Sequence, residues 1–194
     1  METRPKDTEN RLRSLQASAK SSNGAELKLV VDLKKVVEKD GEMDENKINS
    51  VLKSVPNYIG TFALDELNNL RLTRLPCFLI VNLDTRGNPG THWIAIAAYH
   101  HDVYVCDSLG TLLPSSSFPS RLINFLHLIS FKKSLHLTKQ LQNEFSDTCG
   151  FYSTIFIYEM AKHNSYTRFL KSFSSDYFVN DIFVRLLFNS LFSL

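Results

Sequence analysis

A histidine and an aspartate in the middle of the chain are spaced as an acid–base pair would be if the segment between them folds back on itself. Two apolar runs, 93–99 and 103–106, flank the polar residues 100–102 and together predict a β-hairpin. If its turn centres near His100, antiparallel pairing joins residues whose numbers sum to about 200. His92 and Asp107 sum to 199, so we expect their side chains within reach of each other.

An aspartate that accepts a hydrogen bond from one imidazole nitrogen fixes the ring's tautomer and supports its protonated form, as a general base requires. The alternative for His92 and Asp107 is a surface histidine and a surface aspartate at two strand ends. Both interpretations stay open on spacing alone.

Cys149 is a candidate nucleophile because it precedes an apolar segment, 150–162, that is long enough for a buried helix. Peptide dipoles at a helix N-terminus favour the thiolate over the thiol, and Gly150 lets the backbone approach closely. A thiolate paired with a histidine is a nucleophile for acyl transfer. The alternative is a small cysteine that only fills the core.

Gln142 lies seven residues before Cys149, across a polar loop. Its amide could donate, beside the Cys149 backbone N–H, to the oxyanion that develops when a thiolate attacks a carbonyl. Gln140 is a neighbouring competitor, and a solvated loop glutamine is the simpler interpretation of either residue.

The elements that would position these residues follow from hydrophobic spacing. A helix is predicted from a cap at Asp44 to a stop at Pro56, and another after Pro119. Strands are predicted at 77–83 and 134–138, beside the hairpin, and one or two helices after residue 174. The predicted class is α+β, with a small mixed or antiparallel sheet packed against helices and Cys149 at the start of a buried helix.

Length and composition predict one globular domain. The chain has 194 residues, and its net charge of +2 mixes both signs, which argues against a dedicated nucleic-acid-binding domain. Residues 1–25 are polar and aperiodic and are expected to form a disordered arm, followed by a single domain at 26–194. Segment 25–38 suits either a helix or a strand.

Cysteine use and the chain termini predict a soluble, intracellular protein without a metal or cofactor. The three cysteines, Cys77, Cys106 and Cys149, form neither a disulfide framework nor a CxxC pair. The N-terminus is charged where a signal peptide would be apolar, and the apolar run 182–194 is too short and too interrupted to span a bilayer.

Two segments resemble the adenovirus protease (adenain) family, namely GTHWIAIAAYHHDVYVCDSLG and QNEFSDTCGFY. The resemblance implies a cysteine endopeptidase with His92 as base, Asp107 as acidic third member, Gln142 as oxyanion donor and Cys149 as nucleophile. Trp93 would wall the substrate site.

The resemblance covers roughly residues 44–162. The tail FSSDYFVNDIFVRLLF is more similar to the proteases of Polinton or Maverick elements, and the order of the four site residues is shared more distantly with SUMO and Nedd8 proteases. The implied substrates are viral or virus-like capsid precursors cleaved at small or glycine-containing sites, and the implied location is the host nucleus or the virion. The enzyme is expected to act as a monomer.

One departure from the family concerns activation. Adenoviral enzymes form a disulfide with an activating peptide, but no cysteine lies between Asp107 and Thr148 here, so such an activator is not expected. A basic stretch could instead bind DNA as a stimulator or be only a solvated face; its residues are Arg121, Lys132, Lys133 and Lys139.

For the function of the chain as a whole, two alternatives remain. One is a protease for SUMO or ubiquitin-like modifiers, and the other is an inactive DNA- or capsid-binding relative.

Overall fold

The computed structural model describes residues 43–111 and 118–192. They belong to one unit, Met43–Leu194, which is distinct from Met1–Glu42. The predicted arm at 1–25 and the unassigned segment 25–38 lie outside the described residues, so a domain beginning at residue 26 stays a prediction.

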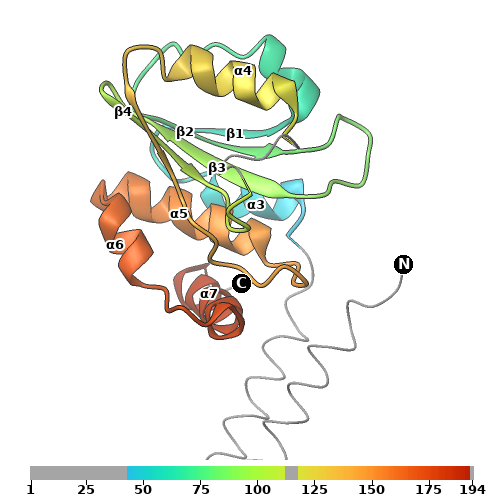
Figure 1. Ribbon diagram of the computed structural model, residues 1–194, viewed down its shortest axis with the longest axis vertical. Helices are drawn as coiled ribbons and strands as arrows, with labels where there is room; N and C mark the ends of the chain where they lie inside the picture. Colours follow the sequence, from blue (N-terminus) through green and yellow to red (C-terminus); the bar gives the residue numbers. More distant parts are fainter. Residues whose placement is uncertain (1–42, 112–117, 193–194) are drawn as a thin grey trace, which may run out of the picture. The chain divides into compact units, whose positions relative to one another are not determined.

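The described residues build a five-stranded mixed sheet in the order β1-β2-β3-β4-β5 (Figure 1). The two central pairings, β2 with β3 and β3 with β4, are antiparallel, and each outer strand is parallel to its neighbour. The strands are β1 (Tyr58–Ala63), β2 (Cys77–Asn82), β3 (Trp93–Ala98), β4 (Asp102–Cys106) and β5 (Ser134–Leu137). The predicted α+β class with a small mixed sheet is confirmed.

The sheet is buried on both faces, which explains why β2 and β3 are almost continuously apolar in sequence. One face packs on α4 (Ser120–Ile129) and the 3-10 helix η1 (Leu64–Asn68), and the other on α5 (Cys149–His163). Successive strand residues point to opposite faces, so Leu79 and Val81 join the α4 core whereas Phe78 and Ile80 join the α5 core.

Three further helices cover the α5 side of the sheet (Figure 1). They are α3 (Glu45–Leu52), α6 (Tyr166–Lys171) and α7 (Tyr177–Phe192). Helix α7 lies beyond α5 from the sheet and packs on it through an edge-to-face contact of Phe151 with Phe188, whose ring centroids are 5.1 Å apart. Among residues 43–111 and 118–192, no helix is long and apolar enough to cross a membrane.

The predicted helix at Asp44 is confirmed but ends earlier than its apolar spacing indicates. Asp44 caps it by accepting a 2.7 Å hydrogen bond from the Lys47 amide. The helix stops at Leu52, and Val55 N–H donates to the Leu52 carbonyl in a tighter turn. Pro56 disfavours helical backbone in the residue before it, so the last turn cannot continue as α-helix.

Candidate active site

The hairpin brings His92 and Asp107 together as its register predicts. Ala95 pairs with Cys106 and Ala98 with Val103, so partners sum to 201, and the two side chains follow from the open end of the hairpin. His92 Nε2 lies 2.8 Å from Asp107 Oδ1, and both residues are buried. The alternative of a surface histidine and a surface aspartate is therefore wrong.

Asp107 is fixed on every side, so its carboxylate has little freedom to leave the ring. Its backbone exchanges two hydrogen bonds with the Thr138 hydroxyl, 2.9 and 2.7 Å long, across to the segment after β5. Its carboxylate oxygens also accept from the Leu109 amide and the Thr111 hydroxyl. These bonds orient Oδ1 toward His92 and keep the buried charge solvated by protein groups.

Cys149 begins α5, as predicted, and its thiol lies near enough to the His92 ring to act on the pKa of that ring. Because Nε2 faces Asp107, Nδ1 is the ring nitrogen left for the sulfur. Burial lowers the pKa of His92, but the hydrogen bond to Asp107 and the neighbouring Cys149 sulfur outweigh that effect and raise the pKa to about 9. The protonated ring is thus favoured at neutral pH, next to a half-buried sulfur.

The start of α5 also offers unused donors. The Thr148 side chain does not cap the helix, and no residue in the described part of the chain accepts from the Cys149 N–H. An unsatisfied amide at a helix N-terminus is a natural partner for an oxyanion.

Gln142, not Gln140, has its amide at the loop that leads to Cys149. Gln142 is buried, its Oε1 accepts from the Ser108 hydroxyl at 2.6 Å, and its Nε2 donates to the Ser146 carbonyl at 2.9 Å. The second hydrogen on Nε2 has no partner among residues 43–111 and 118–192. Gln140 is half-buried and donates to the Gln142 carbonyl.

A tight turn after β4 holds the Gln142 segment in place. Gly110 has a φ of +67°, and a Cβ there would lie 2.4 Å from the Gln140 backbone nitrogen, so glycine is needed for this close approach. The Ser108 carbonyl accepts from the amides of Leu141 and Gln142. The turn thereby links Asp107 to the candidate oxyanion donor.

Trp93 is the first residue of β3, and its side chain reaches the segment that precedes α3. Its Nε1 donates to the Met43 carbonyl at 2.9 Å, and a Cβ on Gly150 would lie 3.3 Å from its ring and 2.4 Å from Met43 Cβ. The indole also lines a cavity of about 120 Å³ beside the loop between β2 and β3. Its role as the wall of a substrate site stays a prediction.

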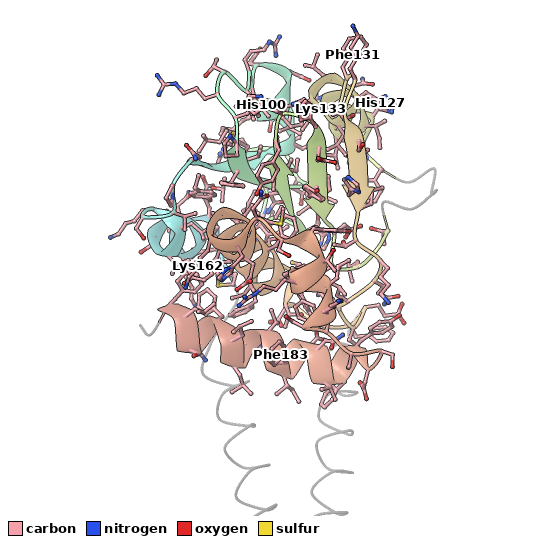
Figure 2. The ribbon with its side chains drawn as sticks, turned by 90° about the vertical axis from the view of Figure 1, so that its left-hand side faces the viewer. His100, His127, Phe131, Lys133, Lys162 and Phe183 are labelled. Carbon is pink, nitrogen blue, oxygen red and sulfur yellow. The ribbon has the colours of Figure 1, made fainter. Side chains whose placement is uncertain are left out.

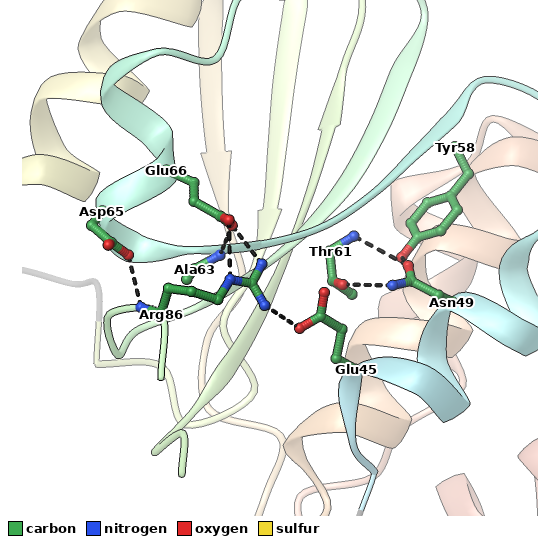
Figure 3. A network of polar contacts seen from close by, with 8 residues as sticks. All are labelled: Glu45, Asn49, Tyr58, Thr61, Ala63, Asp65, Glu66 and Arg86. Carbon is green, nitrogen blue, oxygen red and sulfur yellow. Dashed lines mark hydrogen bonds and ion pairs between the residues drawn. The ribbon is translucent and has the colours of Figure 1, made fainter. Parts of the chain in front are cut away.

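The loop between β2 and β3, which leads to His92, is tied down by Arg86 (Figure 3). The guanidinium donates to Glu66 through Nε and Nη2, at 3.0 and 2.7 Å, and to Glu45 through Nη1. The Arg86 amide donates to Asp65. These contacts hold the loop to η1 and α3, and the side-chain bond from Arg86 lowers the pKa of Glu66.

Four basic residues were predicted as a possible DNA-binding face. Arg121 lies exposed on α4, Lys132 and Lys139 are exposed in loops, and Lys133 donates to the Tyr99 carbonyl at 2.9 Å. Figure 2 shows Lys133 with His100 and Phe131 at the end of the molecule opposite α7. DNA binding there stays a prediction.

The described residues contain no cluster of three or more potential metal ligands.

No protein-family model and no curated protein sequence matches the chain. Its fold is similar to that of the ASFV protease, with a TM-score of 0.53 and 14% identity over 95% of this chain and 90% of that one. The SUMO protease Ulp1 aligns with a TM-score of 0.47 and 16% identity over 84% and 83%. A Chlamydia trachomatis effector protein bound to ubiquitin aligns at 0.44 and 15% over 82% and 74%. The first alignment shows that this chain has the fold of a protease.

Sequence reasoning missed two residues that contact the candidate site. Ser108 holds the Gln142 amide oxygen, and Asp181 on α7 holds Thr148, the residue before Cys149. Neither lies in a recognisable spacing with its partner, which is more than thirty residues away. The one signal that the sequence offered is an acid, Asp181, within the otherwise largely apolar α7 segment.

Proposed function

We propose that the chain is a cysteine endopeptidase with Cys149 as nucleophile. The observation that carries this proposal is a buried imidazole that is hydrogen-bonded to a carboxylate through Nε2 and lies beside Cys149 at the start of α5. A histidine whose pKa is raised to about 9 stabilises a neighbouring thiolate at neutral pH. The similarity of the fold to that of a protease supports the same reaction class.

The geometry supports an acyl-transfer mechanism. His92, oriented by Asp107, holds the proton taken from Cys149, and the thiolate forms a bond to the scissile carbonyl carbon. The carbonyl oxygen becomes an oxyanion, which accepts from the Cys149 N–H and the spare Nε2 hydrogen of Gln142. As the carbonyl re-forms and the C–N bond breaks, His92 gives its proton to the leaving amine. Water, deprotonated by His92, then adds to the acyl carbon, the C–S bond breaks, and the acid product leaves behind the Cys149 thiolate and protonated His92.

The adenain-like motifs support a finer proposal. The substrates would be viral or virus-like capsid precursors cut at small or glycine-containing sites, with the host nucleus or the virion as the place of action. Proteolysis of SUMO or ubiquitin conjugates is the competing outcome, and the experiment below distinguishes the two.

The test uses the full chain with three probes at neutral pH: glycine-rich peptides, SUMO-aminomethylcoumarin and ubiquitin-aminomethylcoumarin. Cleavage of at least one probe is expected from the wild type, and loss of about 10⁴-fold or more from Cys149→Ala. Preference for the glycine-rich peptides supports a precursor-processing enzyme, and preference for a modifier supports the alternative. Retained cleavage by Cys149→Ala would overturn the assignment.

Alkylation with iodoacetamide provides a second measurement that needs no substrate. Burial raises the pKa of Cys77 to about 11 and that of Cys106 well above its ordinary value, so these two thiols serve as internal controls. Mass spectrometry should find the label on Cys149 first. Equal labelling of all three cysteines would contradict an activated Cys149.

A further inference from the structure

The C-terminal helix α7 is hydrogen-bonded to the loop that runs from Gln142 to Cys149. Asp181 accepts from the Asn143 amide through Oδ2 at 3.2 Å and from the Thr148 hydroxyl through Oδ1 at 2.8 Å. One buried carboxylate therefore holds the residue after Gln142 and the residue before Cys149.

Neighbouring residues of α7 make further polar contacts with the same loop. Asn180 Nδ2 donates to the Leu141 carbonyl at 3.0 Å, so both sides of Gln142 are bonded to α7. Arg185, one turn further along, is paired with Asp147. The 141–148 loop is thus fixed at four positions by one face of one helix.

The same face reaches α5. The Tyr152 hydroxyl, on the first turn of α5, donates to Asp181 at 3.0 Å and contacts the Leu141 carbonyl at 3.2 Å. Asp181 consequently connects the loop, the helix that carries Cys149 and α7. Of these three elements, only α7 contributes no proposed catalytic group.

We propose that Asp181 is a positioning residue of the active site, which sets the Gln142 amide relative to the Cys149 N–H through its bonds to Asn143 and Thr148. This inference rests on the proposed function. Gln142 and Cys149 must aim two donors at one oxygen, and small shifts of such donors weaken oxyanion stabilisation strongly. A loop of six residues between them does not fix that geometry by itself.

The burial of Asp181 supports a functional role. Burial raises its pKa to about 6, even though the hydroxyls of Thr148, Ser146 and Tyr152 and the Asn143 amide lower it, and no described residue forms an ion pair with it. An acid that is costly to ionise inside the fold is poorly explained by stability alone. The other titratable or charged groups at this junction are Tyr152, Asp147 and Arg185; burial raises the pKa of Tyr152, and the other two pair with each other.

The decisive variant is Asp181→Asn, which keeps the size of the side chain. Asparagine has one acceptor oxygen where aspartate has two, so it cannot accept from both the Asn143 amide and the Thr148 hydroxyl in the same way. We expect kcat to fall about 10- to 100-fold with KM changed less than about threefold, because oxyanion alignment acts in the transition state. Asp176→Asn is the matched control, since Asp176 accepts from amides at the start of the same helix. That control should keep wild-type kcat.

A double-mutant cycle and a pH series separate positioning from general destabilisation. Thr148→Val should lower kcat by a similar factor, and the double variant with Asp181→Asn should be no worse than the poorer single variant. Below about pH 6 wild-type Asp181 is protonated, so the rate ratio of wild type to Asp181→Asn should approach one. Wild-type kcat in Asp181→Asn, or a ratio independent of pH, would overturn the proposal.

Hydrogen exchange makes the result independent of proteolysis. Amides at 141–149 should exchange faster in Asp181→Asn than in Asp176→Asn, while those of β2 and β3 stay protected. If no probe is cleaved by the wild type but this difference is seen, the proposed function fails and the α7 contact stands. If exchange at 141–149 is unchanged, the positioning role fails. Should Asp181→Asn not fold, Thr148→Val tests the same contact between α7 and the loop, because it removes the hydroxyl that donates to Asp181.

Discussion

The two halves of the candidate site are held by different kinds of structure. His92 and Asp107 stand at the open end of one hairpin, fifteen residues apart, and the antiparallel ladder of β3 and β4 sets their distance. Gln142 and Cys149 lie on a loop and a helix end, which are held by side chains of α7 some forty residues away. The distance within the first half is set mainly by local backbone pairing, whereas the second half depends on tertiary contacts, namely the α7 side chains and the Ser108 carbonyl.

This difference has a consequence for how each half tolerates change. Backbone ladders survive most side-chain substitutions, so only the reacting residues themselves are expected to be sensitive in the hairpin half. In the loop half, a single buried acid carries several bonds, and the sensitivity should extend to residues that never touch a substrate.

The largest effect is expected from Asp107→Asn, which leaves the hairpin intact but removes the carboxylate that orients His92. Loss of about 10⁴-fold in kcat is the order of magnitude for an uncoupled imidazole. Asp102→Asn is the matched control, because Asp102, at the other end of β4, contacts His136 at the same distance of 2.8 Å outside the candidate site. Steady-state kinetics with the best probe should separate the two, and equal losses would refute a specific role for Asp107.

A smaller loss is expected from Gln142→Ala, which removes one of two oxyanion donors. Comparable donors contribute about 10²- to 10³-fold in kcat. Gln140→Ala is the control, since Gln140 donates only to the Gln142 carbonyl, and it should retain most of the activity. The opposite ranking in kcat measurements would move the oxyanion role to Gln140.

The two halves should affect the free energy of unfolding in different pH ranges. The pKa of His92 is raised from 6.5 to about 9, so its contribution is fully present below about pH 6.5 and is lost as the pH rises through 9. The pKa of Asp181 is raised from 3.8 to about 6, so stability falls as the pH rises between these values. Each shift corresponds to at most about 3 kcal/mol.

Urea denaturation across pH 3 to 10 checks this with two variants. Asp107→Asn should flatten the alkaline slope, and Asp181→Asn should flatten the fall in stability between about pH 4 and 6 and leave the alkaline slope. If Asp181→Asn flattens the alkaline slope as well, the two halves are coupled and the contrast between them is wrong.

The smallest effect is expected at Arg86, which ties the loop before His92 to η1 and α3. Its ion pairs with Glu45 and Glu66 are about half exposed, and exposed pairs contribute at most about 1 kcal/mol. Arg86→Gln should lower the unfolding free energy by no more than that, less so at high salt, and change kcat less than about threefold. A loss comparable to that of Asp107→Asn would mean that the hairpin does not hold His92 unaided.

Hydrophobic spacing in the sequence determined most of the fold near the site. The strands at 77–83 and 134–138, the hairpin and the helix at Cys149 were predicted and are confirmed. Strand β1 and helix α6 were not predicted. In β1, Gly60 has a φ of +122° at an irregularity in the pairing with β2, and a glycine in such a position carries no strand pattern.

The proximity of His92 and Asp107 was readable from the sequence because register is arithmetic once the turn is known. The choice of Gln142 over Gln140 rested on resemblance, and it gains support from the Ser108 and Ser146 contacts that close only in the folded chain. The part played by Asp181 was decided by tertiary structure alone, because its bonds span twenty-nine to thirty-eight residues. Local patterns report periodicity and turns, whereas contacts at such separations depend on how helices pack.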